Sequence, residues 1–504
     1  MSHTGEWTDG EAEPAVPAGH GAPVLRRLGP PEPERAAAYV VPAEAISASP
    51  SSEPLGAAAP SAHPWGTPGE VGRLVLRGGA WSLAISATGA ALSLGVHLLL
   101  ARTTGAEEYG RYVFALAWMN MLALVGRFEL DTASVRFVGA YSGTEQWSFL
   151  RGFLRRSTQI VGGASVAIAA VSALVILAFF DRLERGTALA FLAACALLPV
   201  FSMAQLKAAV IQGLKHVARA QLPSLVVRPV AFALGILALH YWLGTAVDAR
   251  MAVLLQLGAT ALALLLTLSF LRGVLPEPAR TAREAFDTRY WMTTAAGLLV
   301  ISAGQIILST NADVLVVGSL LGPGSAGRYG AASQLASAVS FGVSAISFIA
   351  LPLIADLYAR RAMPQLQQLI TRVARLGLLL SIPVLLVLFV TARDALSVFG
   401  PSFEDAWTLL ILLGFDQLIG VVFGVAGYLL VMTGHQATAA RVVVGCAALN
   451  LALTFALTPA FGLLGAGAAT TITTVVRSYL LTARMRAALG VSLAPWVPRT
   501  SLPR

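Results

Sequence analysis

Charged side chains are rare in the long apolar segments of this chain, and the few that occur there are the residues best suited to chemistry. They include Arg127, Glu129, Asp131, Arg136, Arg228, Asp313, Asp416 and Arg477. A charge in such a segment is costly and usually faces a cavity, so each is a candidate for function. A guanidinium group binds phosphate oxygens in a bidentate manner, whereas an acidic side chain suits proton or cation exchange. The alternative role is an internal salt bridge, and Arg127 and Asp131, four positions apart, can pair on a helix.

The segments around these charges are too long and too apolar for a water-soluble domain. The chain has 504 residues, of which 56% are hydrophobic and 12% charged, with a mean hydropathy of +0.72. A soluble domain has about 25% charged residues. The runs at 79–101 and 161–180 are long enough to cross a bilayer as helices, and barrel strands would give a weaker, alternating pattern. The composition therefore predicts an all-α polytopic membrane protein.

Twelve candidate transmembrane helices emerge when hydropathy is followed along the chain with a window of about 19 residues. The predicted spans are 79–101, 110–130, 157–180, 187–211, 221–243, 250–271, 291–320, 327–355, 370–392, 404–432, 438–459 and 464–483. Internal prolines such as Pro199, Pro229 and Pro383 are compatible with these helices, because neighbouring helices can satisfy the freed backbone groups.

A short motif occurs twice and relates the two halves of the chain. TTGAEEYGRYVFAL at 103–116 aligns without a gap with LLGPGSAGRYGAAS at 320–333. The matched pairs are Gly105 with Gly322, Gly110 with Gly327, Arg111 with Arg328 and Tyr112 with Tyr329. Each copy is the predicted glycine turn between the first two spans of a six-span block. Because six is even, both blocks enter the membrane in the same direction, which predicts two parallel six-helix lobes.

Positive residues between the spans predict the orientation. Those on one side are Arg151, Arg155, Arg156, Lys207, Lys215, Arg219, Arg272, Arg280, Arg283, Arg289, Arg360, Arg361, Arg372, Arg375, Arg484 and Arg486. Because positive loops stay on the cytoplasmic side, we expect a multi-pass protein of the cytoplasmic (inner) membrane with both termini in the cytoplasm. For most of these arginines the alternative to a transport role is simply to fix topology and touch lipid phosphates.

The predicted organisation follows from the spans and from shifts in composition. It comprises a disordered Ala/Pro-rich tail (1–70), an N-terminal lobe (75–272), a cytoplasmic linker (273–290), a C-terminal lobe (291–487) and a C-terminal tail (488–504). Cys195 and Cys446 are expected to be buried hydrophobes, because no zinc spacing or disulfide framework occurs. No phosphate-binding loop for ATP is present either. We expect no catalytic residue, metal, cofactor or nucleic acid.

The stretch NADVLVVGSLLGPGSAGRYGAAS at 311–333, with the copy near 97–116, resembles a family pattern. The chain is similar to the polysaccharide-biosynthesis flippases, the oligosaccharide-lipid transporters of the multidrug/oligosaccharidyl-lipid/polysaccharide exporter superfamily. The matching positions are Asp313, Gly318, Gly322, Pro323, Gly327 and Tyr329. The stretches 130–141 and 432–472 are also family-like, so the resemblance covers about 75–502. The tail at 1–70 departs from the pattern.

The resemblance implies two lobes that rock around a cavity and flip a polyprenyl-pyrophosphate-linked oligosaccharide. On that reading, Arg127, Arg228 and Arg477 are candidates for binding the phosphate head of the cargo. The acids Glu129, Asp131 and Asp313 are candidates for proton or sodium coupling or for gating. His97 is expected to make a structural hydrogen bond rather than to titrate. The expected partners are the lipid-linked glycan, membrane lipids and the polysaccharide polymerase machinery, and the expected state is a monomer.

Two other classes of function are compatible with parts of the sequence. A cation-coupled multidrug exporter of the same superfamily would favour acids over arginines in its cavity. A membrane polymerase or glycosyltransferase would need a substantial outside loop, and the longest one predicted here is near 393–405. The arginines and the short loops therefore favour the flippase. Its cargo could belong to O-antigen, capsule, exopolysaccharide or teichoic acid synthesis.

Overall fold

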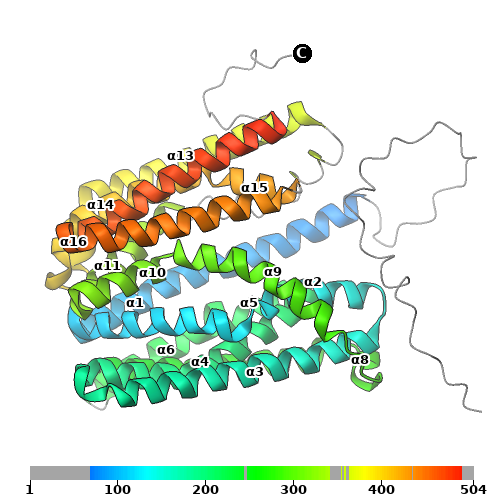
Figure 1. Cartoon of the computed structure of the whole chain (residues 1–504), viewed down its shortest axis with the longest axis horizontal. Coiled ribbons are helices and arrows are strands. Elements are labelled where there is room, and N and C mark those ends of the chain that lie inside the picture. The colour runs from blue at the N-terminus through cyan, green and yellow to red at the C-terminus, as the bar shows by residue number, and fades with distance from the viewer. Residues whose placement is uncertain are drawn as a thin grey trace, which may run out of the picture. The chain divides into compact units, whose positions relative to one another are not determined.

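The computed structural model describes residues 68–242, 244, 247–340, 354, 357–358, 362–433 and 435–490, with side chains from Ala84 onward except at 301, 428 and 432 (Figure 1). The regular elements in these ranges are all helices. Nine of the helices in the described ranges are long and apolar enough to cross a membrane. The chain is therefore an all-α, multi-pass membrane protein, as its composition predicts. Most of each predicted tail, at 1–70 and 488–504, lies outside the described residues.

The first half of the chain supplies the helices that surround the site described below. Its elements are α1 (Pro68–Arg127), α2 (Leu130–Gly143), α3 (Trp147–Ala178), η4 (Phe180–Arg182), α4 (Arg185–Gly213), α5 (Val217–Leu222), η5 (Pro223–Val227), α6 (Arg228–Leu237), η6 (Ala238–Trp242) and α7 (Ala249–Val274). The helix α4 packs against α1, α2, α3 and α7, which places it at the centre of this half.

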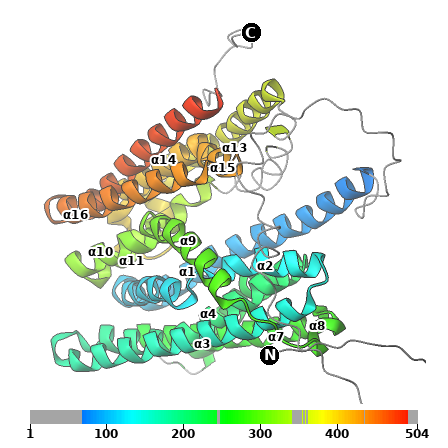
Figure 2. The same ribbon diagram turned by 45° about the vertical axis from the view of Figure 1, so that its right-hand side comes forward.

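The second half begins after a short connecting helix. Its elements are α8 (Glu277–Thr281), α9 (Thr288–Ile307), α10 (Thr310–Leu321), α11 (Pro323–Ala336), α13 (Met363–Ser397), η7 (Pro401–Ala406), α14 (Trp407–Phe423), α15 (Val425–Met432) and α16 (Gln436–Leu489). The helix α13 packs on α14, and both α14 and α15 pack on α16. Figures 1 and 2 show these four helices as a group in yellow to red.

Two of the longest helices contain sharp turns and each cover two predicted spans. At Gly105 the backbone of α1 leaves the helical region, with φ 76° and ψ 174°. His97 Nδ1 nevertheless lies 3.1 Å from the Tyr109 hydroxyl, whereas twelve residues of straight helix would separate them by about 18 Å. The chain therefore folds back at Gly105. The same happens in α16 at Gly462, after which a Cβ on Gly465 would lie 2.1 Å from the Leu457 carbonyl oxygen.

Two predicted spans differ from the structure. The single span predicted at 291–320 is wrong, because α9 ends at Ile307 and α10 begins at Thr310. Ser309 makes the break by capping the new helix, since its hydroxyl accepts a hydrogen bond from the backbone NH of Asn311. The span predicted at 327–355 corresponds in its first part to α11, and most of its remainder lies outside the described residues.

The repeated motif proves to be a packing motif. Gly322 has φ 86° and ψ 169°, nearly the conformation of Gly105. A Cβ on Gly110 would lie 1.9 Å from the Pro323 carbonyl oxygen, and one on Gly327 would lie 2.6 Å from the Ala106 carbonyl oxygen. These contacts are reciprocal, as expected for two copies related by a two-fold axis. Figure 2 shows the result, with α10 and α11 beside α1.

The helix α9 and the segment before it also contact the first half. Trp291 donates a hydrogen bond from Nε1 to the Tyr141 hydroxyl at 2.9 Å and meets the Phe153 ring edge-on. Further along α9, a Cβ on Gly304 would lie 2.8 Å from Val443 of α16. One end of α9 thus packs on α2 and α3, and the other end packs on α16.

Candidate functional site

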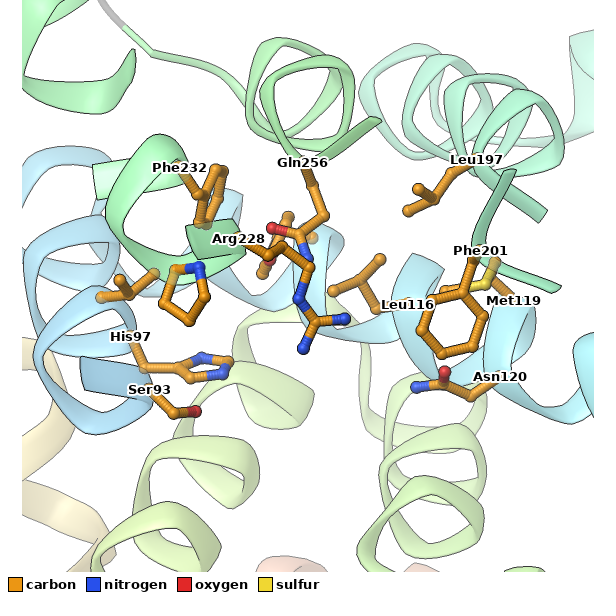
Figure 3. Close-up of a pocket in the computed structure, with 13 residues that line it drawn as sticks. Ser93, His97, Leu116, Met119, Asn120, Leu197, Phe201, Arg228, Phe232 and Gln256 are labelled. Atoms are coloured by element: carbon orange, nitrogen blue, oxygen red, sulfur yellow. The ribbon is translucent and has the colours of Figure 1, made fainter. Parts of the chain in front are cut away.

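A cavity of about 210 Å³ lies inside the first half of the chain, between both arms of α1 and the helices α4, α6 and α7. Polar and apolar side chains both line it, and the polar lining residues are Ser93, His97, Tyr112, Asn120, Arg228 and Gln256. Figure 3 shows the guanidinium group of Arg228 pointing into the middle of this space, with His97 on one side and Asn120 and Phe201 on the other. We call this space the arginine cavity.

A local irregularity of the helix places Arg228 in the cavity. The residues before it, Pro223–Val227, form a π-helical turn, and Pro229 follows directly at the start of α6. Such turns are wider than an α-helical turn and occur often at functional sites. Arg228 makes no ion pair or hydrogen bond within the part of the chain that the structure describes. A partly buried cation without an anionic partner is unfavourable, so this arrangement favours binding of an anion.

The other polar groups of the arginine cavity have partners in the fold. His97 bonds through Nδ1 to the Tyr109 hydroxyl, which confirms the structural hydrogen bond expected for this residue. Asn120 donates from Nδ2 to Asn311 Oδ1 at 3.2 Å and so joins the cavity to α10. These groups help to fix the shape of the cavity, while the free donors of Arg228 face its interior.

Arg127 and Asp131 form the predicted ion pair, with Nε and Oδ2 2.9 Å apart. They do not lie on one continuous helix, because Phe128 and Glu129 between them have φ values of 50° and 56°. This left-handed break ends α1 and starts α2. Arg127 also lies over the Phe201 ring at 5.5 Å, and Phe201 lines the arginine cavity. Arg127 is therefore next to that cavity but outside its lining.

Glu129 is a buried acid in this left-handed break. It is 5% exposed, and its Oε2 has no hydrogen-bond partner among the described residues. Non-glycine residues in this conformation are uncommon and cluster at functional sites. A buried carboxylate oxygen without a partner is costly. The geometry suits a group that changes its hydrogen-bond partner.

The second half contains a buried carboxylate at Asp313, which is 3% exposed. Its Oδ2 accepts hydrogen bonds from the Tyr329 hydroxyl at 2.9 Å and the Thr470 hydroxyl at 3.0 Å. Its Oδ1 has no hydrogen-bond partner in the described ranges. Tyr329 belongs to the second copy of the repeated motif. A carboxylate with one satisfied and one free oxygen can take up a proton or a cation.

Asp416, a charge in the predicted span 404–432 to which the sequence assigned no specific role, is a second buried acid close to this group. It is 7% exposed, makes a hydrogen bond with Thr474 and interacts electrostatically with Arg477 and with Asp313. Its position in an apolar run marks it as a candidate, as for Asp313, but only its contacts in the fold indicate a role. Arg477 thus lies near acids of the second half and does not line the arginine cavity. The three predicted arginines are not gathered in one described pocket.

Solved structures of several helical membrane proteins share this fold. An inward-facing multidrug resistance MATE family transporter of the MOP superfamily is similar, with a TM-score of 0.65 and 13% identity over 82% of this chain and 98% of that chain. The lipid II flippase MurJ, in an inward closed conformation, has a TM-score of 0.62 and 13% identity over 80% of this chain and 87% of that chain. A MOP superfamily transporter from Pyrococcus furiosus has a TM-score of 0.54 and 12% identity over 83% and 96% of the two chains.

The family model of polysaccharide biosynthesis proteins matches residues 75–358, more than half of the 504 residues. The chain belongs to this family, as the motif at 311–333 predicts. No curated protein matches the chain. The low identities to the solved structures establish the shared fold, and the family match places that fold in polysaccharide biosynthesis.

Proposed function

We propose that this protein flips a polyprenyl-pyrophosphate-linked oligosaccharide across the cytoplasmic membrane by alternating access, without catalysing a covalent step. The observation that carries the proposal is Arg228, an unpaired guanidinium group in a cavity of a polysaccharide biosynthesis family member. A glycan joined to pyrophosphate cannot cross hydrocarbon unaided, because its charges would lose their hydration. A fixed cation within a polar cavity replaces part of that hydration.

Each candidate residue has a role in this proposal. Arg228 binds the pyrophosphate, and Arg127 provides a second positive charge beyond Phe201. Arg477 contacts the cargo only if its interaction with Asp416 is released, so it is the weakest of the three phosphate candidates. Asp313 is the coupling residue that binds a proton or sodium ion. Glu129 and Asp131 act as a gate, because they occupy the break between α1 and α2.

The proposed orientation rests on the charged residues at one end of the helices. Arg151 donates a hydrogen bond to the Ala282 carbonyl oxygen at 2.8 Å, and Arg155 pairs with Glu284 at 2.5 Å. The segment between α7 and α9 is thus held on α3 among positive residues. We place this end in the cytoplasm by the positive-inside rule. Membrane lipids surround the protein, and a polysaccharide polymerase is the expected downstream partner of a monomer.

A second candidate function is export of an organic cation. The buried carboxylates of Asp313 and Asp416 favour it, since acids attract cationic cargo. The unpaired Arg228 in the arginine cavity opposes it, because a fixed positive charge repels such cargo. The two functions therefore predict cargo of opposite charge: an anionic lipid-linked glycan for the flippase and an organic cation for the exporter.

The test is transport into vesicles that contain the purified full-length protein. One set of vesicles receives a labelled polyprenyl-pyrophosphate oligosaccharide, and a matched set receives a fluorescent organic cation. We expect the glycan lipid to cross faster than in protein-free vesicles and the cation to cross at the protein-free rate. Transport of the cation alone would overturn the proposal in favour of the exporter.

A further inference from the structure

A second cavity, of about 650 Å³, continues the arginine cavity toward the α2 end of the first half. It lies between α2, α4, α5 and η5, and its lining is rich in uncharged polar side chains. The polar residues among them are Thr132, Gln205, Gln212, Gln221 and Ser224, together with the ions Asp131 and Arg136. We call this space the glutamine cavity.

The two cavities lie one after the other along the same face of α4. Leu197 and Phe201 line the arginine cavity, and Gln205, Ala209 and Gln212 line the glutamine cavity. These positions recur every three or four residues, which is the spacing of one helix face. Phe201 and Gln205 are one turn apart, or about 6 Å along the axis. The lining of one cavity therefore passes directly into the lining of the other.

The two cavities also follow one another along the helix formed by α5, η5 and α6. Ser224 and Leu225 line the glutamine cavity, whereas Arg228 and Phe232 line the arginine cavity. The π-helical turn Pro223–Val227 lies at the junction and sets the position of Arg228 relative to Ser224. The lining residues of α4 and those of the α5–η5–α6 helix therefore both indicate that the cavities are successive parts of one path.

Arg127 and Phe201 mark the boundary between the two cavities. Phe201 lines the arginine cavity, Arg127 lies over its ring at 5.5 Å, and the ion-pair partner Asp131 lines the glutamine cavity. Phe201 and Arg127 therefore lie where the two linings meet. A ligand longer than the arginine cavity would have to pass these two side chains to reach the glutamine cavity.

The chemistry of the glutamine cavity matches sugar hydroxyls rather than phosphate. A primary amide offers both donors and acceptors, and a hydroxyl requires both. The side chains of Gln205 and Gln212 make no hydrogen bonds to other described residues. We propose that the glutamine cavity binds the sugars next to the pyrophosphate of the cargo, with Gln205 and Gln212 as the contacting residues. This inference rests on the proposed function and adds the site for the glycan.

The experiment measures equilibrium binding to the full-length protein in lipid nanodiscs with two probes. One probe is the lipid-linked glycan extracted from membranes of the source organism, and the other is polyprenyl pyrophosphate without sugar. We expect the Gln205→Leu/Gln212→Leu double variant to bind the glycan lipid about tenfold more weakly, because two hydrogen bonds are lost. Binding of the sugar-free lipid should not change.

Two further variants make the test specific. Ala209→Trp fills the glutamine cavity. It should also weaken binding of the glycan lipid and leave binding of the sugar-free lipid unchanged. Gln159→Leu changes an exposed residue of α3 that lines neither cavity and should bind both lipids like the wild type. Equal weakening of both lipids by the double variant, or no weakening of either, would overturn the glycan site. If the wild type binds neither lipid, the proposed function itself fails, and the glycan site with it.

Discussion

The two copies of the repeated motif share their backbone and their packing, yet their tyrosines have different polar surroundings. Tyr112 stacks on Phe232, with ring centroids 5.8 Å apart, and lines the cavity that contains Arg228. Tyr329, the matching residue of the second copy, donates a hydrogen bond to the buried carboxylate of Asp313. The duplicated sequence therefore kept the glycines that join the halves, while the charge beside each tyrosine became opposite in sign.

In the proposed function, this difference gives the two halves separate tasks. The cation in the first half binds the phosphates of the cargo, and the acids in the second half bind a proton or a sodium ion. Asn120 and Asn311 connect the two regions through one hydrogen bond of 3.2 Å. Substitutions at Arg228 and Asp313 test the difference in charge, and substitutions at the glycines and tyrosines of the two copies test the packing and the polar surroundings.

The largest expected effect comes from the Arg228→Gln substitution. Loss of a charge-assisted contact to pyrophosphate should weaken binding of polyprenyl pyrophosphate about a hundredfold, or by about 2.7 kcal/mol. Equilibrium binding in nanodiscs measures the change. The control is Arg250→Gln, an exposed arginine at the start of α7, which should leave binding unchanged. Equal affinity of the Arg228→Gln variant and the wild type would remove the cationic task from the first half.

The next effect tests the contact that the two copies share. Gly110→Ala places a Cβ 1.9 Å from the Pro323 carbonyl oxygen, so the two halves must separate locally. We expect a loss of about 2 kcal/mol in the free energy of unfolding, measured by thermal unfolding in detergent. Gly95→Ala, where a Cβ meets no atom within 4 Å, should be neutral or stabilising. A stable Gly110→Ala variant would contradict the tight reciprocal packing.

The Asp313→Asn substitution tests the task of the second half. Without its ionisable group, the site no longer exchanges a proton or binds a cation strongly, so the stimulation of transport by an ion gradient should fall about tenfold. Binding of polyprenyl pyrophosphate should stay as in the wild type. Asp405→Asn, at an exposed position of η7, serves as the control. Loss of lipid binding with unchanged coupling would reverse the assignment of the two halves.

The smallest effect compares the two tyrosines directly. Tyr329→Phe removes a hydrogen bond to a buried carboxylate and should cost about 1 kcal/mol of unfolding free energy. Tyr112→Phe keeps the stacked ring on Phe232 and should cost less. Chemical or thermal unfolding of the two single variants gives the comparison. A larger loss from Tyr112→Phe would show that the polar surroundings were assigned to the wrong copy.

Hydropathy and the repeated motif were sufficient to predict the helical membrane fold and the turn at Gly105. They also identified Arg228 and Asp313, because a charge within an apolar run is costly. The break at Ser309 was missed because a single serine carries little weight in a hydropathy window. The relative positions of Arg127, Arg228 and Arg477 could not be predicted, since helices that are apolar on all sides do not encode which face points inward.

The same limit explains why Asp416 was not chosen and why the glutamine cavity escaped notice. Asp416 becomes significant only through its neighbours Thr474 and Arg477 on another helix. Gln205 and Gln212 are ordinary polar residues until the packing of α4 against α2 and α5 gathers them around one space. Contacts between helices distant in sequence decide both features.

Photo-crosslinking locates the bound pyrophosphate group and so tests directly whether it lies at Arg228. Polyprenyl pyrophosphate with a photoreactive group next to the pyrophosphate is bound to the full-length protein, irradiated and mapped by mass spectrometry of peptides. If the pyrophosphate binds in the arginine cavity, we expect labelling of α6 near Arg228 and of the α1 arms between Ser93 and Asn120. The Arg228→Gln variant should lose this labelling. Labelling confined to α14 and α16, around Asp416 and Arg477, would contradict binding in the arginine cavity.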